Sequence, residues 1–257
     1  EACPRVLVCD GYRRATGSGK PQLCSEEAYN TFLDEVERLK TAGEFGECHV
    51  LKLDTCHGYG LALGRALDAV ATEFVLVVQH DWLFVQDVDL SAAIAAMDTD
   101  PEVKYIGMQS LTTLDYAKRM RVRYGLELPP SREVNGGLTL TPQLFWYDKP
   151  HVSRAAHYRE VVLRDAPNRV GECPERKYGL EFMWPRLRAA GDRLAEEHLR
   201  FGTFFWEVGA EVVYHLSGRK LKAAADSAEG EAAGSSEPSS PSAPRDAAAP
   251  LAGPHDA

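Results

Sequence analysis

The sequence predicts an α/β fold with a mostly parallel sheet flanked by helices. Strand and helix patterns alternate from residue 5 to residue 81, the order typical of right-handed βαβ units. The run Phe74-Val75-Leu76-Val77-Val78 is continuously apolar, as in a strand that helices cover on both faces. Roughly 222 residues precede a polar C-terminal segment, enough for one domain of this class with a sizeable core.

Each element of the alternating part carries its own local signal. Arg5–Cys9 is a short apolar strand that the turn pair Asp10-Gly11 ends. Ser25 can cap a helix whose first turn is acidic, and Gly43 ends that helix. The part is completed by a strand at 49–53, a Gly-containing loop at 54–60, a helix that buries Leu63 and Leu67, and the strand at 74–78.

The pattern after residue 81 is less regular. Residues 111–134 have no clear period and carry a basic cluster, which fits either a solvated helix face or the binding of an anionic ligand. The cluster is Lys118, Arg119, Arg121 and Arg123. The other predicted elements are helices at 90–97, 153–163 and 179–190, strands at 104–108, 138–140 and 211–215, and a turn at 135–137.

Charge and composition exclude several classes of protein. The 257 residues carry a formal net charge of −9. Residues 223–257 hold six acids and one base among Ala, Ser, Pro and Gly, a composition that predicts a disordered tail. Residues 223–257 therefore carry a net charge of −5, and the rest of the chain carries −4, which is the difference between −9 and −5. Because the rest of the chain also has no stripe of Lys and Arg residues, we expect no nucleic-acid partner.

No apolar run approaches the ~20 residues that a membrane span needs, so we expect no span in this sequence. The chain begins at Glu1 without a Met, which favours a fragment. The sequence leaves two compartments open: the cytoplasm, or the Golgi lumen if an upstream anchor is missing from this fragment. The six cysteines include no C-x-x-C pair, which argues against structural zinc. Cys9 is expected to be a buried thiol, while the disulfides Cys3–Cys24 and Cys48–Cys56 are possible.

Three groups of side chains are candidates for a site. Gln79, His80 and Asp81 directly follow the buried strand, and in parallel sheets ligands bind at the carboxyl ends of strands. A strand that merely reaches the surface would also end in polar residues. Trp146 and Tyr147 are adjacent rings of the kind that pack in cores or stack on sugars. Glu181 is expected in the first turn of a helix among apolar neighbours, which would raise its pKa.

The order of these pieces resembles glycosyltransferases of the GT-A type, a Rossmann-like fold, and especially the family-two-like members. The similarity spans roughly residues 4–220. The resemblance implies that Asp10 and the loop and helix from Gly58 to Leu67, with Arg65, contact the nucleotide. It places Gln79-His80-Asp81 at the D-x-D motif, which holds a divalent metal on the donor diphosphate. It also matches Glu181 through Arg188 to Gly191 with the helix that carries the catalytic base.

The resemblance therefore implies a metal-assisted transfer of sugar from a nucleotide-sugar donor to a carbohydrate or other hydroxyl acceptor. Asp81 and the late His215 would hold Mn²⁺ or Mg²⁺, and an imidazole ligand favours Mn²⁺. Glu181 would be the catalytic base. Asp10, Gly58, Arg65, Gln79 and His80 would contact the donor, and Trp82, Arg119, Trp146 and Tyr147 would contact substrate.

Two features keep other functions open. The first Asp of D-x-D is Gln79, which adds no charge and favours a catalytically silent sugar-nucleotide-binding or glycan-binding domain on the same fold. The loop from Gly11 to Lys20 is rich in glycine and basic residues, as in some nucleotidyltransferases. It does not match the phosphate-binding pattern G-x-x-x-x-G-K-[ST], because Pro21 follows Lys20.

Overall fold

The computed structural model describes residues 3–13, 24–134 and 137–216, which form an α/β fold. The predicted tail at 223–257, the domain boundary at 222 and most of the loop from Gly11 to Lys20 lie outside these ranges. None of the described helices combines the length and the apolar composition that crossing a bilayer requires.

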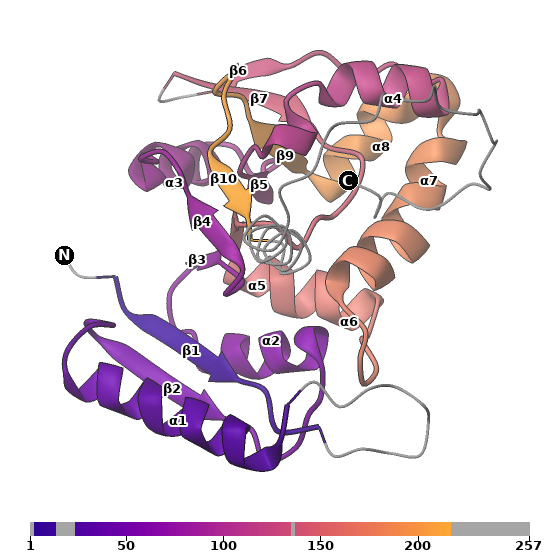
Figure 1. Ribbon diagram of the computed structural model, residues 1–257. Helices are drawn as coiled ribbons and strands as arrows, with labels where there is room; N and C mark the ends of the chain where they lie inside the picture. Colours follow the sequence, from indigo (N-terminus) through magenta and orange to yellow (C-terminus); the bar gives the residue numbers. More distant parts are fainter. Residues whose placement is uncertain (1–2, 14–23, 135–136, 217–257) are drawn as a thin grey trace, which may run out of the picture.

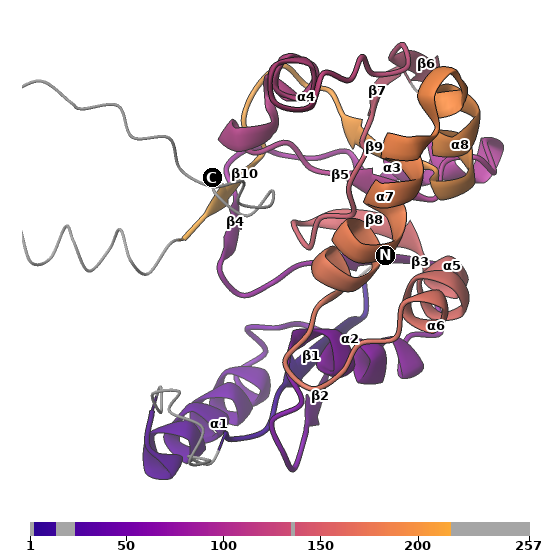
Figure 2. The same ribbon diagram turned by 90° about the vertical axis from the view of Figure 1, so that its right-hand side faces the viewer.

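The N-terminal elements form one βαβ unit followed by a helix. Strands β1 (Arg5–Cys9) and β2 (Cys48–Lys52) pair in parallel over their full length. Helix α1 (Glu26–Thr41) connects them, and its cap Ser25 accepts a hydrogen bond from the Ala28 amide, as predicted. Figures 1 and 2 show these elements and α2 (Tyr59–Asp68) together at one end of the molecule.

A six-stranded sheet forms the centre of the larger part of the molecule. Its order is β3-β8-β5-β9-β7-β6, and only β5 and β9 run parallel as neighbours. The expectation of a mostly parallel sheet is therefore wrong, because this sheet is mixed. The strands are β3 (Phe74–Val77), β8 (His151–Arg154), β5 (Tyr105–Gly107), β9 (Thr203–Trp206), β7 (Leu138–Pro142) and β6 (Arg132–Val134).

Strand β8 explains the difference. It lies between β3 and β5 and is antiparallel to both. The predicted helix at 153–163 includes Ser153, but Ser153 belongs to β8 and the helix begins at Ala155. Four residues with one β-branched member, Val152, are too few to display the two-residue period of a strand. With β8 inserted, β3 becomes the first strand of this sheet rather than a central one.

Helices cover both faces of the sheet. Strand side chains alternate, so Tyr105 and Phe205 join one buried cluster with α4 and α7, while Ile106 and Phe204 join another with α3. The sequence pattern predicts neither α8 nor β9. The helical segments are α3 (Leu90–Thr99), α4 (Tyr116–Tyr124), α5 (Ala155–His157), a π-helical turn (Tyr158–Val162), α6 (Leu163–Asp165), a π-helical segment (Glu175–Met183), α7 (Trp184–Ala189), α8 (Leu194–Phe201), and 3-10 turns at Leu111–Thr113 and Gly191–Arg193.

A small antiparallel pair completes the fold and carries the predicted motif. Strand β4 (Trp82–Phe84) pairs with β10 (Val213–His215), and His215 lies opposite Trp82. Figure 2 shows this pair standing out from the rest of the molecule, between the N-terminal unit and α4. The pairing joins segments that are about 130 residues apart in the sequence.

Candidate active site

The motif after β3 forms a tight turn that presents a carboxylate to an imidazole. The Trp82 amide donates to the Gln79 carbonyl at 3.3 Å, which closes the turn Gln79-His80-Asp81-Trp82. Nε2 of His215 lies 3.0 Å from Oδ2 of Asp81. The other carboxylate oxygen, Oδ1, is buried and has no hydrogen-bond partner among the described residues. The structure thus brings together the two residues predicted as metal ligands.

Asp81 and His215 are both of residue types that ligate divalent cations. A buried carboxylate oxygen without a partner is costly unless something binds it, and a carboxylate beside an imidazole suits Mn²⁺ better than Mg²⁺. Within the described ranges, no group of three or more His, Cys, Asp or Glu side chains is arranged to hold a metal. Asp81 and His215 would therefore supply two ligands, and a bound diphosphate would have to supply others.

The two residues before Asp81 differ in their surroundings. The Gln79 side chain is half-buried, and its Nε2 donates to the Asp148 carbonyl at 2.9 Å. That bond fixes the turn against the loop between β7 and β8 and uses part of the amide for structure. His80 is exposed at the corner of the turn, where a ligand can reach it.

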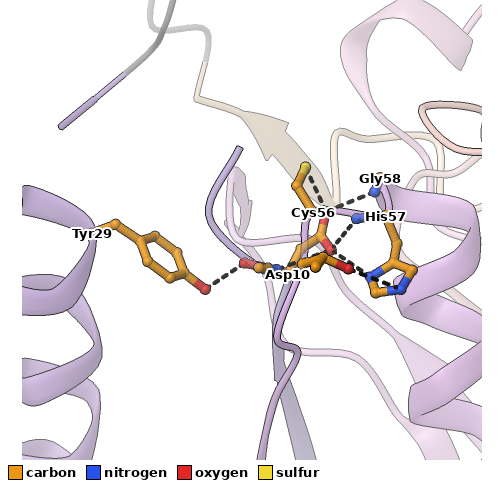
Figure 3. Close-up of polar contacts among 7 residues, drawn as sticks. Asp10, Tyr29, Cys56, His57 and Gly58 are labelled. Atoms are coloured by element: carbon orange, nitrogen blue, oxygen red, sulfur yellow. Dashed lines mark hydrogen bonds and ion pairs between the residues drawn. The ribbon is translucent and has the colours of Figure 1, made fainter. Parts of the chain in front are cut away.

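Asp10 organises the loop that precedes α2 (Figure 3). Its carboxylate accepts hydrogen bonds from the amides of His57 at 2.8 Å and Gly58 at 2.7 Å, and from the Cys56 thiol at 3.3 Å. The Tyr29 hydroxyl donates to the Asp10 main-chain carbonyl. The carboxylate is thus largely occupied by protein donors, so its observed role is to hold the loop. Contact with a nucleotide base stays a prediction.

Gly58 and Arg65 lie at opposite ends of α2. Gly58 is the N-cap residue with φ +85°, and a Cβ there would come within 2.7 Å of the Gly171 backbone, so only glycine fits. The Gly60 amide donates to the Glu172 carbonyl at 3.0 Å. The helix N-terminus is therefore partly capped by protein. Arg65 is exposed in the last turn, about 10 Å along the helix from Gly58 at 1.5 Å per residue.

The three predicted aromatic residues have different environments. Trp82 is half-buried, and its ring centroid lies 4.8 Å from that of His215. Tyr147 is buried and belongs to the hydrophobic core. Trp146 is fully buried and packs against Tyr105 and Tyr158, so it presents no face to a ligand and belongs to the core. Trp82 is therefore the ring that a sugar could reach beside the Asp81–His215 pair.

Glu181 is not in the first turn of its helix, because the helical segment begins at Glu175. The side chain is exposed and bonds Lys177 at 2.8 Å and Arg176 at 3.1 Å. Hydrogen bonding to Lys177, with a smaller contribution from Arg176, lowers the pKa of Glu181. The expected rise in pKa is therefore wrong, since two cations outweigh the apolar neighbours.

Helix α4 carries the predicted basic cluster on its outer side. Arg121 pairs with Glu127 at 2.5 Å and faces solvent, as the solvated-face interpretation expects. Arg119 is half-buried, and its positive charge acts to lower the pKa of Tyr147. A shallow hollow of about 280 Å³ lies on this side, lined by Asp115, Lys118, Arg119, Val122 and Arg123.

Sequence reasoning missed Lys149, in the loop between β7 and β8. Its ammonium donates to the Ser110 hydroxyl at 2.7 Å and the Thr112 hydroxyl at 2.8 Å, and it lies 5.7 Å from the centroid of the Trp82 ring. Burial lowers the pKa of Lys149 to about 8. The signal was present, since Asp148-Lys149 directly follows the apolar run from Leu144 to Tyr147.

The neighbouring Asp148 is fully inside the protein. Burial, and then the charge of Glu175, raise its pKa well above the usual range. Its Oδ1 accepts from the Glu175 amide at 3.2 Å, and the Glu175 carboxylate accepts from the Asp148 amide at 3.0 Å. This reciprocal pair fastens the Lys149 loop to the helix that carries Glu181. Asp148 is thereby a structural carboxyl group.

All six cysteines are free thiols in the structure, so neither of the two possible disulfides is formed. Cys9 is buried in β1, as expected.

No model of a known protein family matches the sequence, and a search of curated proteins finds no match either.

Proposed function

We propose that this protein is a glycosyltransferase that moves a sugar from a nucleotide-sugar donor to a hydroxyl acceptor with the help of a divalent cation. The observation that carries the proposal is the Asp81–His215 pair, 3.0 Å apart, with the second Asp81 oxygen buried and unpartnered. Trp82 beside His215 supports it, because an indole face packs well on a sugar ring.

The chemistry of such a transfer has two requirements. The bond from the sugar to the donor diphosphate breaks, and the charge that develops on the diphosphate needs a cation. A bond forms from the sugar to the acceptor oxygen, whose proton passes to a base. Asp81 and His215 would hold the cation. Glu181 is the candidate base, although its lowered pKa makes it a weak one.

The test begins with binding. Mn²⁺ is paramagnetic and should quench the fluorescence of Trp82, whose ring lies 4.8 Å from that of His215. Asp81→Asn and His215→Gln should abolish or weaken this quenching, and the exposed Asp87→Asn should not. A panel of sugar nucleotides, with Mn²⁺, Mg²⁺ or chelator, then measures release of nucleoside diphosphate. Turnover that requires the cation and Asp81 would support the proposal, and equal quenching in all variants would refute the cation site.

The second candidate is a catalytically silent sugar-nucleotide-binding or glycan-binding domain. Two observations favour it: the Gln79 amide is engaged by Asp148, and the Glu181 carboxylate is engaged by Lys177. Binding of a sugar nucleotide without transfer or hydrolysis, under conditions where the cation binds, would select this function.

A further inference from the structure

Lys149 is a cation whose hydrogen-bond partners are neutral hydroxyl groups. Its ammonium donates to the hydroxyls of Ser110 and Thr112, and the rings of Trp82 and Tyr147 lie 5.7 Å and 5.3 Å away. The charge of Glu175, and less strongly that of Glu211, raises the pKa of Lys149, but neither carboxylate forms an ion pair with Lys149 among the described residues. Removing a charge from water without a bonded counter-ion is unfavourable, so such a lysine is suited to a ligand that supplies the negative charge.

A second cation lies close enough to influence the pKa of Lys149. Arg119 comes from α4, and its charge lowers the pKa of both Lys149 and Tyr147. Arg121, two residues further along the same helix, forms an ion pair with Glu127. Among the described residues, Arg119 forms no such ion pair. Two neighbouring like charges repel each other, and an anion between them would relieve that repulsion and gain charge-assisted hydrogen bonds.

The location indicates which part of a substrate would lie there. In both Figure 1 and Figure 2, β4 and β10 stand between α4 at one end and β1 with α2 at the other. The predicted nucleotide contacts Asp10 and Gly58 belong to the latter end. The Trp82 ring adjoins both His215 and Lys149. Arg119, on α4, therefore lies on the side of the β4–β10 pair that is away from β1 and α2.

We infer that Lys149 and Arg119, with the hydroxyls of Ser110 and Thr112, form an anion site that selects an acceptor carrying a phosphate or carboxylate group. The assignment to the acceptor rests on the proposed transferase function. The anion site itself rests only on the side chains named, so the two parts can fail separately.

Binding of inorganic phosphate tests the anion site. Titration followed by tryptophan fluorescence and thermal shift should show phosphate binding to the unaltered protein. Arg119→Met and Lys149→Met should weaken it about tenfold or more, the scale of one charge-assisted bond. Arg121→Met is the matched control on the same helix and should bind as the unaltered protein does. Equal affinity in all four proteins, or no binding to any, overturns the site. Arg119→Met keeps the test valid if Lys149→Met does not fold.

Two further measurements test the acceptor assignment. Nucleoside diphosphate with Mn²⁺ should bind Arg119→Met as tightly as the unaltered protein. A phosphate-bearing sugar should compete with inorganic phosphate, and the matching neutral sugar should not. Loss of nucleotide binding in Arg119→Met would assign the anion site to the donor and overturn the acceptor inference. Phosphate binding that depends on Arg119, without any sugar-nucleotide binding, would refute the proposed function and the acceptor inference while the anion site stands.

Discussion

Replacing Asp10 by Asn should measurably destabilise the fold, because it removes one of two carboxylate oxygens that hold the loop before α2. Oδ1 accepts from the His57 amide and Oδ2 from the Gly58 amide. An Asn side chain keeps one acceptor and turns an N–H donor toward the other amide. Losing a hydrogen bond to a charged acceptor costs about 1.5–3 kcal/mol, and the stranded amide adds to that. The Asp10 side chain is 27% exposed, so we expect about 2–3 kcal/mol in total.

Urea unfolding followed by circular dichroism measures this loss. For a chain of this size, about 2–3 kcal/mol corresponds to a melting temperature lower by about 4–12 °C. Asp68→Asn, an exposed carboxylate at the far end of α2, is the control. A second readout is the Cys56 thiol. Burial and then Asp10 raise the pKa of Cys56, so Asp10→Asn should make Cys56 react faster with thiol reagents. Equal unfolding midpoints for the two variants would refute the role given to Asp10.

Two other predictions concern pH. Burial lowers the pKa of His151, His157 and His198 to about 4. The unfolded chain takes up protons near pH 6.5 that the folded chain does not, so stability should fall as the pH drops from about 6.5 toward 5. Urea midpoints that stay constant over this range would contradict this. Lys149 has a pKa of about 8 and is faced by Arg119, Glu175 and Glu211. Phosphate affinity should therefore weaken between about pH 7.5 and 9, and titrations at these two values check it.

The N-terminal unit was predictable because its signals are local. The Ser25 cap, the acidic first turn and the alternation of β1, α1 and β2 all lie within short windows of sequence, and the structure confirms them. Strand β8 was not predictable in this way. Its four residues are specified by burial between β3 and β5, a tertiary effect that propensity does not express. That one strand changes the sheet from mostly parallel to mixed.

The same contrast between local signals and tertiary effects applies to the candidate site. Asp81 follows one predicted apolar strand and His215 ends another, and the β4–β10 pairing brings them together. The environment of a side chain was harder to foresee. Trp146 and Trp82 look alike in sequence, yet one is in the core and the other is accessible. Lys149 is notable only once burial shows that hydroxyls and rings surround it.

The role of Glu181 can be decided through its partner Lys177, without altering Glu181. Lys177 lies one helical turn earlier, and its hydrogen bond is the largest cause of the lowered pKa of Glu181. In Lys177→Met the pKa of Glu181 should rise. A base acts only when deprotonated, so if Glu181 is the base, the acid limb of the pH–rate profile should move to higher pH. Glu181→Gln should then cut transfer by about 10²-fold or more while donor binding is kept. An acid limb that stays in place in Lys177→Met would assign the base to another residue and leave Glu181 with a structural role only.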